Sequence, residues 1–389
     1  MNTGSLIYNI GITLLPGVGS ITAKNLIAYC GSAETVFSEK RSRLEKIPGI
    51  GTIAADTITN SAVQKDALVR AEEEIRFIEK ENITPLFFTD EPFPKRLKEC
   101  ADSPVMLYTK GAMNPADYRS LHMPPISNGM NLNAERIVSI VGSRKSTSYG
   151  KKICEQLVDA LASYNVLILS GMAYGIDICA HRASLKNNLP TVGVLAHGLD
   201  NLYPAEHYNT AEKMLENGGL VSEFMSHTKM NPEYFPRRNR IVAGMADATL
   251  VIEATVKSGA LITAEIANSY DRDVFAVPGR LDDPSSEGCN LLIKANKAML
   301  MQSADDVIRV MNWDMESKKS KQRQQVLFEH LSPEEETLVN ILKQKEKAHV
   351  DDISHASGLA MGRTAALLLN LEFSGVIKSL PGKVYMLNN

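Results

Sequence analysis

The 389-residue sequence lacks an excess of charge of either sign, since its formal net charge at pH 7 is −3. A protein with this balance does not coat nucleic acid through a uniformly basic surface, so any anion-binding site must be a local patch. The hydrophobic fraction of 44% and the charged fraction of 22% are those of an ordinary soluble globular protein. The length favours two or three domains.

Cysteines at metal-binding or redox spacing are also missing. The chain contains no CxxC pair and no cluster of histidine and cysteine. Its five cysteines are scattered over Cys30, Cys100, Cys154, Cys179 and Cys289. This pattern argues against a structural zinc site and favours a reducing compartment.

Long apolar runs are missing as well. No run approaches the length of a membrane span, and the N-terminus lacks a basic segment followed by an apolar one. We therefore expect a cytoplasmic protein with no membrane partner, and no motif of the sequence calls for a cofactor.

The most informative stretch runs from Phe235 to Arg280. It opens with the segment FPRRNR, and the apolar run 248–252 follows as a predicted buried strand. The turn Ser258-Gly259 then begins a helical pattern, and 273–277 forms the next predicted strand. Strands alternating with helices in this way indicate a parallel α/β sheet, in which ligands bind at the carboxyl ends of the strands. The arginines and the Ser-Gly turn are thus expected to face one crevice that suits phosphate.

A second turn that is expected to bind phosphate precedes this stretch. The predicted strand 137–141 runs into Gly142-Ser143-Arg144-Lys145, and a helix is expected over 151–164. A glycine turn that carries Arg and Lys before a helix N-terminus is a phosphate-binding arrangement. Neither the dinucleotide fingerprint GxGxxG nor a Walker A loop occurs in the sequence.

A third turn follows the predicted strand 166–169, where Ser170-Gly171 and Gly175 allow the backbone to approach a ligand closely. Asp177 stands just before the expected helix as a helix cap, a ligand to a bound group or an acid–base residue. His181 lies four residues later on the same helical face, where a paired histidine is more often structural than catalytic.

The N-terminal part contains a near-repeat, LPGVG at 15–19 and IPGIG at 47–51. Each copy predicts a helix, a tight Gly-x-Gly hairpin and a second helix. Paired helix-hairpin-helix motifs bind DNA phosphates without reading sequence. Equally, the hairpins could serve only to turn the chain, because few basic residues accompany them.

The C-terminal part shows the element order of a winged helix, with helices at 350–356 and 362–373 and a hairpin over 376–387. Its expected recognition helix carries only Arg363 and Glu372 as charged residues. Readout of a DNA sequence needs more donors, so contact with a protein is an equal alternative to contact with DNA.

These patterns divide the chain into five segments. We expect a helical domain at 1–70, a connecting segment with a long surface loop (111–136) at 71–136, an α/β core at 137–310, a linker at 311–332 and a winged-helix domain at 333–389.

The motifs of the core resemble the DNA-processing protein A family, DprA or Smf, and they follow one another in the same order. The matching segments are VGSRKSTSYG (141–150), SGMAYGID (170–177), HGLDNLYP (197–204), SEF (222–224), FPRRNRIVAG (235–244), VIEATVKSGALITAEIA (251–267), VFAVPGR (274–280) and GCNLLIKANKAML (288–300).

The resemblance implies an extended Rossmann-like fold with a mostly parallel sheet. It also implies a non-enzymatic mediator of natural transformation that protects incoming single-stranded DNA and loads the RecA recombinase onto it. The expected DNA-binding residues are Gly142, Ser143, Arg144, Lys145, Ser170, Gly171, Gly175, Phe235, Arg237, Arg238, Asn239, Arg240, Ser258 and Gly259. A homodimer through the core is expected to use Leu291, Leu292 and Met299.

The alternative is a nucleotide-binding or nucleotide-cleaving enzyme on a related Rossmann-like core. Phosphoribohydrolases of this kind carry a PGGxGTxxE loop at the comparable turn. The segment KSGALITAE keeps Gly259 and Glu265 of that loop but lacks its other glycines and its threonine. In the mediator hypothesis Glu265 is a first-turn residue that the helix dipole favours.

Overall fold

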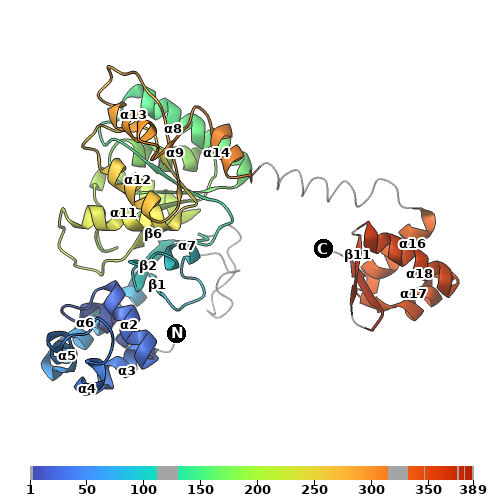
Figure 1. The fold of residues 1–389 in the computed structure, drawn as a ribbon, viewed down its shortest axis with the longest axis horizontal. Helices are drawn as coiled ribbons and strands as arrows, with labels where there is room; N and C mark the ends of the chain where they lie inside the picture. Colours follow the sequence, from blue (N-terminus) through green and yellow to red (C-terminus); the bar gives the residue numbers. More distant parts are fainter. Residues whose placement is uncertain are drawn as a thin grey trace. The chain divides into compact units, whose positions relative to one another are not determined.

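The structure is a computed structural model that describes residues 3–111, 130–313, 332–345, 347–374, 376–380 and 382–387. The chain divides into two compact units, Met1–Val307 and Ile308–Asn389, each described by itself below (Figure 1). Among the described residues, no helix is long and apolar enough to cross a membrane.

A sheet of nine strands forms the centre of the first unit, in the order β1-β2-β6-β5-β4-β3-β7-β8-β9. The strands are β1 (Thr84–Phe87), β2 (Met106–Gly111), β3 (Ile137–Val141), β4 (Leu167–Ser170), β5 (Thr191–Val194), β6 (Gly218–Ser222), β7 (Ala248–Val251), β8 (Asp273–Ala276) and β9 (Met299–Leu300). Strands β3 to β9 pair in parallel, whereas β2 is antiparallel to both β6 and β1. The predicted mostly parallel α/β sheet is therefore confirmed.

The strand order reverses beside β3. From β3 the chain moves outward through β4, β5 and β6, and then returns to place β7 on the other side of β3. Such a reversal is a topological switch point, where the loops that leave two neighbouring strands diverge and open a crevice at their carboxyl ends. The turns after β3 and β7 are the two turns for which the sequence predicts phosphate binding.

Helices cover both faces of this sheet. Along β4, Leu167 and Leu169 belong to the same apolar core as Ile241 of α11 and Ala264 of α12, whereas Ile168 between them points to the opposite face. Helices α8 and α9 pack against each other and α9 packs on β3, β4 and β5, while α11 packs on α12 (Figure 1). The helices of this part are α7 (Lys95–Lys98), α8 (Ser148–Leu161), α9 (Ile176–Lys186), α10 (Tyr208–Met214), α11 (Tyr234–Met245), α12 (Gly259–Ser269), α13 (Glu287–Lys294) and α14 (Ala304–Val310), with short 3-10 turns at Ala162–Tyr164 and Ala205–His207.

The N-terminal helices build a second core, to which residues of β1 and β2 also belong. The helices are α1 (Thr3–Gly11), α2 (Ser20–Cys30), α3 (Ala33–Ser38), α4 (Arg41–Leu44), α5 (Thr52–Thr59) and α6 (Ser61–Lys80), with a 3-10 turn at Ile12–Leu14. The expected boundary at residue 70 falls inside α6. Because Ile75 and Ile78 of the same helix pack into the N-terminal core, we propose a boundary near Lys80 instead.

Both predicted Gly-x-Gly hairpins stand between two helices. Gly17 and Gly49 have positive φ angles of 78° and 85°, which only glycine adopts without strain. Gly19 and Gly51 then precede α2 and α5 at the N-cap position.

The second unit has the elements of a winged helix. Helices α16 (Pro333–Lys345), α17 (Val350–Ser357) and α18 (Met361–Phe373) pack with an antiparallel sheet in the order β10 (Lys347–His349), β12 (Val384–Leu387), β11 (Ile377–Leu380). The predicted helices and hairpin of this segment are confirmed. Most of the expected linker, 314–331, lies outside the described residues.

Two expectations about exposed segments need correction. Of the long loop expected over 111–136, residues 112–129 lie outside the described residues, but Met130 and Leu132 are buried in the main core. Leu292, expected at a dimer interface, is also buried in that core, at 3% exposure. Its neighbour Leu291 lies on the outer face of α13 at 49% exposure.

The contrast between these two leucines predicts their effects on stability. Leu292→Ala removes buried apolar atoms and leaves a cavity, which costs about 2–5 kcal/mol of unfolding free energy. Leu291→Ala is expected to change the unfolding free energy by less than about 0.5 kcal/mol, because its side chain is half exposed. Urea unfolding of both variants, followed by circular dichroism, measures the difference. Equal effects would contradict the burial of Leu292 within one chain.

Candidate functional site

A cleft with a volume of about 940 Å³ lies at the switch point. Its walls come from the turns after β3, β4 and β7 and from the first turns of α11 and α12. Ten of the predicted site residues line it, namely Gly142, Ser143, Arg144, Lys145, Gly171, Phe235, Arg238, Asn239, Ser258 and Gly259. Residues separated by more than a hundred positions in the sequence thus meet in one crevice, as the parallel-sheet argument predicts.

Backbone hydrogen bonds fix the turn after β3. Ser143 N–H donates to the Glu253 carbonyl at 2.7 Å, and Ile176 N–H donates to the Ser143 carbonyl at 3.2 Å. Gly175 has a φ of +82°, and a Cβ there would lie 2.0 Å from the Ser143 carbonyl oxygen. Gly175 is therefore required so that α9 can begin against this turn, although it does not line the cleft itself.

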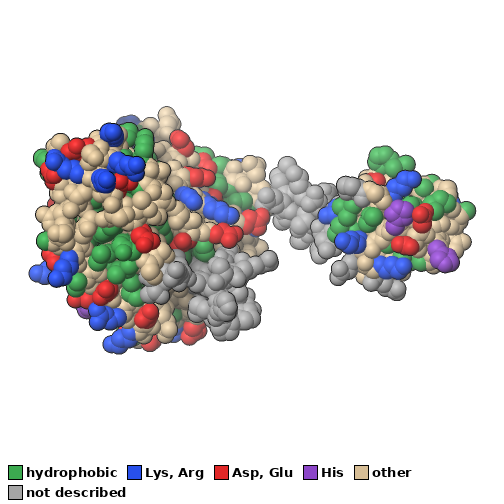
Figure 2. All heavy atoms as spheres, turned by 90° about the horizontal axis from the view of Figure 1, so that it is seen from below, with side chains coloured by type: hydrophobic (Ala, Val, Ile, Leu, Met, Phe, Trp, Pro, Cys, Tyr) green, Lys and Arg blue, Asp and Glu red, His purple; other side chains and the backbone are tan. Residues whose placement is uncertain are grey.

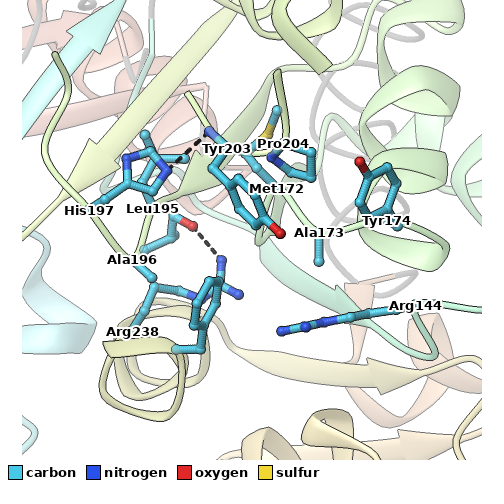
Figure 3. Close-up of a pocket in the computed structure, with 12 residues that line it drawn as sticks. Arg144, Met172, Ala173, Tyr174, Leu195, Ala196, His197, Tyr203, Pro204 and Arg238 are labelled. Carbon is cyan, nitrogen blue, oxygen red and sulfur yellow. Dashed lines mark hydrogen bonds between the residues drawn. The ribbon is translucent and has the colours of Figure 1, made fainter. Parts of the chain in front are cut away.

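Arg144 extends from this turn over an aromatic ring. Its guanidinium carbon lies 5.3 Å from the centroid of the Phe235 ring, within cation–π range. The side chain of Arg144 is exposed, so its N–H groups remain available to a ligand. Figure 3 shows Arg144 and Arg238 pointing toward each other from opposite sides, with the Tyr203 hydroxyl directed at the space between them. These side chains line a small recess of about 30 Å³ that adjoins the cleft.

The side chain of Arg238 lies on the buried side of α11, where hydrogen bonds fix its guanidinium. It is only 7% exposed, and its guanidinium donates to the Val194 carbonyl and, at 3.1 Å, to Asn239 Oδ1. Burial lowers the pKa of this guanidinium, and the charge of Asp177 opposes that effect. A Cβ on Gly171 would lie 2.1 Å from Arg238 Nη1 and 2.5 Å from Asp177 Oδ2. The absence of a side chain at Gly171 is what allows these two charged groups to approach the floor of the cleft.

The structure excludes the helix-cap role considered for Asp177. Gly175 occupies the N-cap position of α9, so Asp177 lies in the first turn, where it is buried and lines the cleft. Burial raises the pKa of its carboxyl to about 6, and the positive charge of Arg238 limits the rise. Asp177 is therefore not a helix cap, and its carboxylate offsets part of the positive charge of the cleft.

His181 has a structural role. Its Nε2 is 2.7 Å from the Gly171 carbonyl and its Nδ1 is 2.7 Å from Thr191 Oγ1. Burial lowers the pKa of the imidazole to about 4, which keeps the ring neutral near pH 7. The ring connects α9 to the turn after β4 and does not reach the cleft.

Three further residues of the predicted set lie away from the cleft. Ser170 is fully buried and its hydroxyl donates to the Ile140 carbonyl at 2.6 Å, so it joins two strands. Arg237 and Arg240 both form ion pairs with Glu223, at 3.0 and 2.5 Å, and Arg237 also lies over the Phe224 ring. The prediction that these arginines line the crevice is therefore wrong, because a helix turns 100° per residue and, of the basic segment 237–240, only Arg238 and Asn239 face the cleft.

Several residues that line the cleft were not predicted from the sequence. Tyr203, Lys257 and the segment 230–232 line it without having been assigned. Lys257 directly precedes the Ser-Gly turn, and its position was a usable signal. Tyr203 belongs to the turn region after β5, and its approach to Arg144 depends on tertiary folding that no local pattern contains.

The sequence matches models of known protein families over both units. The family model described as DNA recombination-mediator protein A matches residues 126–312, and that of the DprA winged helix domain matches residues 322–383. Protein Smf of Synechocystis sp. is 31% identical over 408 residues, which cover 97% of this chain and 98% of that protein. The chain belongs to the DprA/Smf family. The resemblance inferred from the core motifs is confirmed.

Other members of the family agree with this assignment. The DNA processing protein DprA of Bacillus subtilis is 35% identical over 228 residues, covering 59% of this chain and 71% of that protein. The X-ray structure of DprA from Streptococcus pneumoniae matches with a TM-score of 0.62 and 28% identity, over 79% of this chain and 97% of that chain. The DprA structure from Helicobacter pylori, described for its single-stranded DNA binding mode, matches with a TM-score of 0.50 and 27% identity, over 60% of this chain and 96% of that chain. The first unit therefore has the Rossmann-type fold of DprA.

The environment of Asp177 predicts how the stability of the protein depends on pH. The folded carboxyl has a pKa of about 6, compared with the ordinary value of 3.8. The folded state therefore binds more protons than the unfolded state between about pH 4 and 6, and its stability falls as pH rises through that window. Asp177→Asn abolishes this loss.

The unfolding free energy of Asp177→Asn relative to wild type is thus expected to rise by about 2 kcal/mol from pH 4 to pH 7. Denaturant unfolding at several pH values measures it, and any contribution from His181 cancels because both proteins contain this residue. Parallel pH profiles would contradict the raised pKa.

Proposed function

We propose that the cleft binds single-stranded DNA, and that the protein acts in the cytoplasm during natural transformation to protect incoming strands and load the RecA recombinase onto them. The observation that carries the proposal is the placement of Arg144 over the Phe235 ring at the switch-point cleft. The family assignment supports it, as does the single-stranded DNA binding mode described for the Helicobacter pylori protein.

The guanidinium of Arg144 and the aromatic ring of Phe235 both suit unpaired nucleotides. A guanidinium donates to phosphate oxygens, and an aromatic ring offers a surface on which any base can stack. The first turn of α12 adds Ser258 and Gly259 at a helix N-terminus, and the space beside Gly259 is open. Backbone N–H groups at such a turn favour an anion. Binding through these groups is expected to be tolerant of sequence.

The positive charge of the cleft is local. Among the described residues, four basic side chains line it, from Arg144, Lys145, Arg238 and Lys257, against the single acid Asp177. Elsewhere, positive and negative side chains are interspersed on the face drawn in Figure 2. A chain with a formal net charge of −3 can therefore attract a polyanion to this one crevice, and the attraction weakens as salt rises.

We further propose that two copies associate through the outer faces of α13 and β9. Leu291 and Met299 are exposed there at 49% and 36%, together with Leu300. The strand β9 ends the order of the nine-stranded sheet. Leu292 is not part of this surface, because it is buried in the core of its own chain.

No observation favours the phosphoribohydrolase alternative. Glu265, the carboxylate on which that hypothesis depends, forms an ion pair with Lys297 at 2.9 Å and is 59% exposed. Among the described residues that line the cleft, Glu265 does not occur. Glu265 is the seventh residue of α12 and lies beyond its first turn, so the expectation that it is a first-turn residue is wrong.

The proposal predicts that Arg144→Ala weakens binding of oligo(dT) by about 10- to 100-fold, because a phosphate contact and a stacking partner of Phe235 are lost. The log–log salt slope is expected to become less steep by about 0.7, the value for one phosphate contact on single-stranded DNA. Fluorescence anisotropy across a salt series measures both quantities.

Arg237→Ala is the matched control, since it removes an arginine from the neighbouring helix α11 outside the cleft. It is expected to bind within about twofold of wild type. Unchanged affinity in Arg144→Ala, or an equal loss in Arg237→Ala, would overturn the assignment of the cleft.

A further inference from the structure

A second cavity lies on the other side of the Gly142–Lys145 turn. Its volume is about 500 Å³, and it is bounded by α8, α9 and the 3-10 turn at Ala205–His207. Arg144 and Lys145 line both this cavity and the cleft. We call it the lateral pocket.

The side chains that line the lateral pocket carry a net positive charge, and part of it comes from residues that do not line the cleft. Lys151 of α8 and Arg182 of α9 join Arg144 and Lys145 in its walls, against the acids Glu155 and Glu206. Four positive and two negative side chains leave a surplus of two positive charges in this small volume. Because these charges lie on one surface, an anion that binds in the pocket is attracted by all four cations.

These cations are not neutralised by the acids beside them. Lys151 and Glu155 stand at i and i+4 on α8, a spacing at which ion pairs form readily on helices. Within the described part of the chain, however, Lys151, Arg182 and Lys145 take part in no ion pair. Arg182 makes one long hydrogen bond, at 3.4 Å to Thr210 Oγ1. Their donors therefore remain available to phosphate oxygens.

The pocket also contains an exposed aromatic ring in a fixed position. Tyr174 is 43% exposed and packs edge-on against His207, with the ring centroids 5.0 Å apart. His207 is buried and its Nδ1 lies 2.8 Å from the Met172 carbonyl, while the Tyr174 hydroxyl donates to Glu206 at 2.9 Å. A ring held in this way is a stacking surface that loses little conformational entropy when a base contacts it.

We infer that the lateral pocket receives the nucleotides of a single strand that leaves the cleft past Arg144, with Lys151 and Arg182 binding their phosphates and Tyr174 stacking on a base. The two cavities share the side chains of Arg144 and Lys145, so one continuous backbone can reach both. This inference rests on the proposed function, because it extends the path of the same ligand.

The test compares two lengths of oligo(dT), about 6 nucleotides to fill the cleft and about 20 nucleotides to reach beyond it. The variant is Lys151→Gln with Arg182→Gln. Its affinity for the short strand is expected to stay within about twofold of wild type, and its affinity for the long strand to fall about tenfold. Its salt slope with the long strand is expected to become less steep by about 1.4, which is 0.7 for each of two phosphates.

The matched control is Lys152→Gln with Lys186→Gln. It removes the same charge from the same two helices, at exposed positions outside both cavities. It is expected to bind both strands as wild type does. All four substituted side chains are exposed, and equal thermal midpoints of the two double variants verify that they are folded.

The outcomes separate this inference from the function on which it rests. A wild-type protein that binds neither strand overturns the proposed function, and the inference with it. If wild type binds the long strand and the Lys151/Arg182 variant binds it as tightly as the control variant, only the inference is overturned. A loss of equal size for both lengths also overturns it, because the pocket would then not be a continuation of the cleft.

Discussion

The site depends on the hydrogen bond from Ser143 N–H to the Glu253 carbonyl, at 2.7 Å. This bond joins the turns that leave β3 and β7, the two strands that flank the switch point. The carboxylate of the same glutamate is buried and accepts from Thr147 N–H at 2.9 Å and from Thr147 Oγ1 at 2.7 Å, at the start of α8. A buried polar group left without a partner costs about 1–3 kcal/mol, so each of these bonds strongly favours one geometry of the turn. The position of Arg144 follows from that geometry.

Around this fixed turn, charge is arranged in two layers. Arg238 and Asp177 are buried beneath the cleft and compensate each other in part, which lets a guanidinium remain where water is excluded. Arg144 and Lys145 are exposed above them and face both the cleft and the lateral pocket. The buried layer sets the shape and residual charge of the floor, and the exposed layer is the part that can meet a mobile polyanion.

Much of this could be predicted from the sequence, because the parallel sheet and its turns depend on local patterns. Largely apolar runs such as 137–141 and glycine turns such as Gly142 specify strands and loops without knowledge of the rest of the fold. The sequence could not show which arginines of FPRRNR face the cleft and which pair with an acid. That depends on the rotational position of α11 and on Glu223, which follows a strand distant in the sequence. Leu291 and Leu292 raise the same problem, because adjacent residues of a helix face different directions.

Single-stranded DNA is proposed to lie in the switch-point cleft against Arg144 and Phe235. Photo-crosslinking of oligo(dT) that carries 4-thiothymidine, followed by mapping of the crosslinked peptides, tests it most directly. Crosslinks are expected in the peptides that contain Phe235 and the Gly142–Lys145 turn. Crosslinks confined to the N-terminal helices, 3–80, or to the winged helix, 332–387, would contradict it.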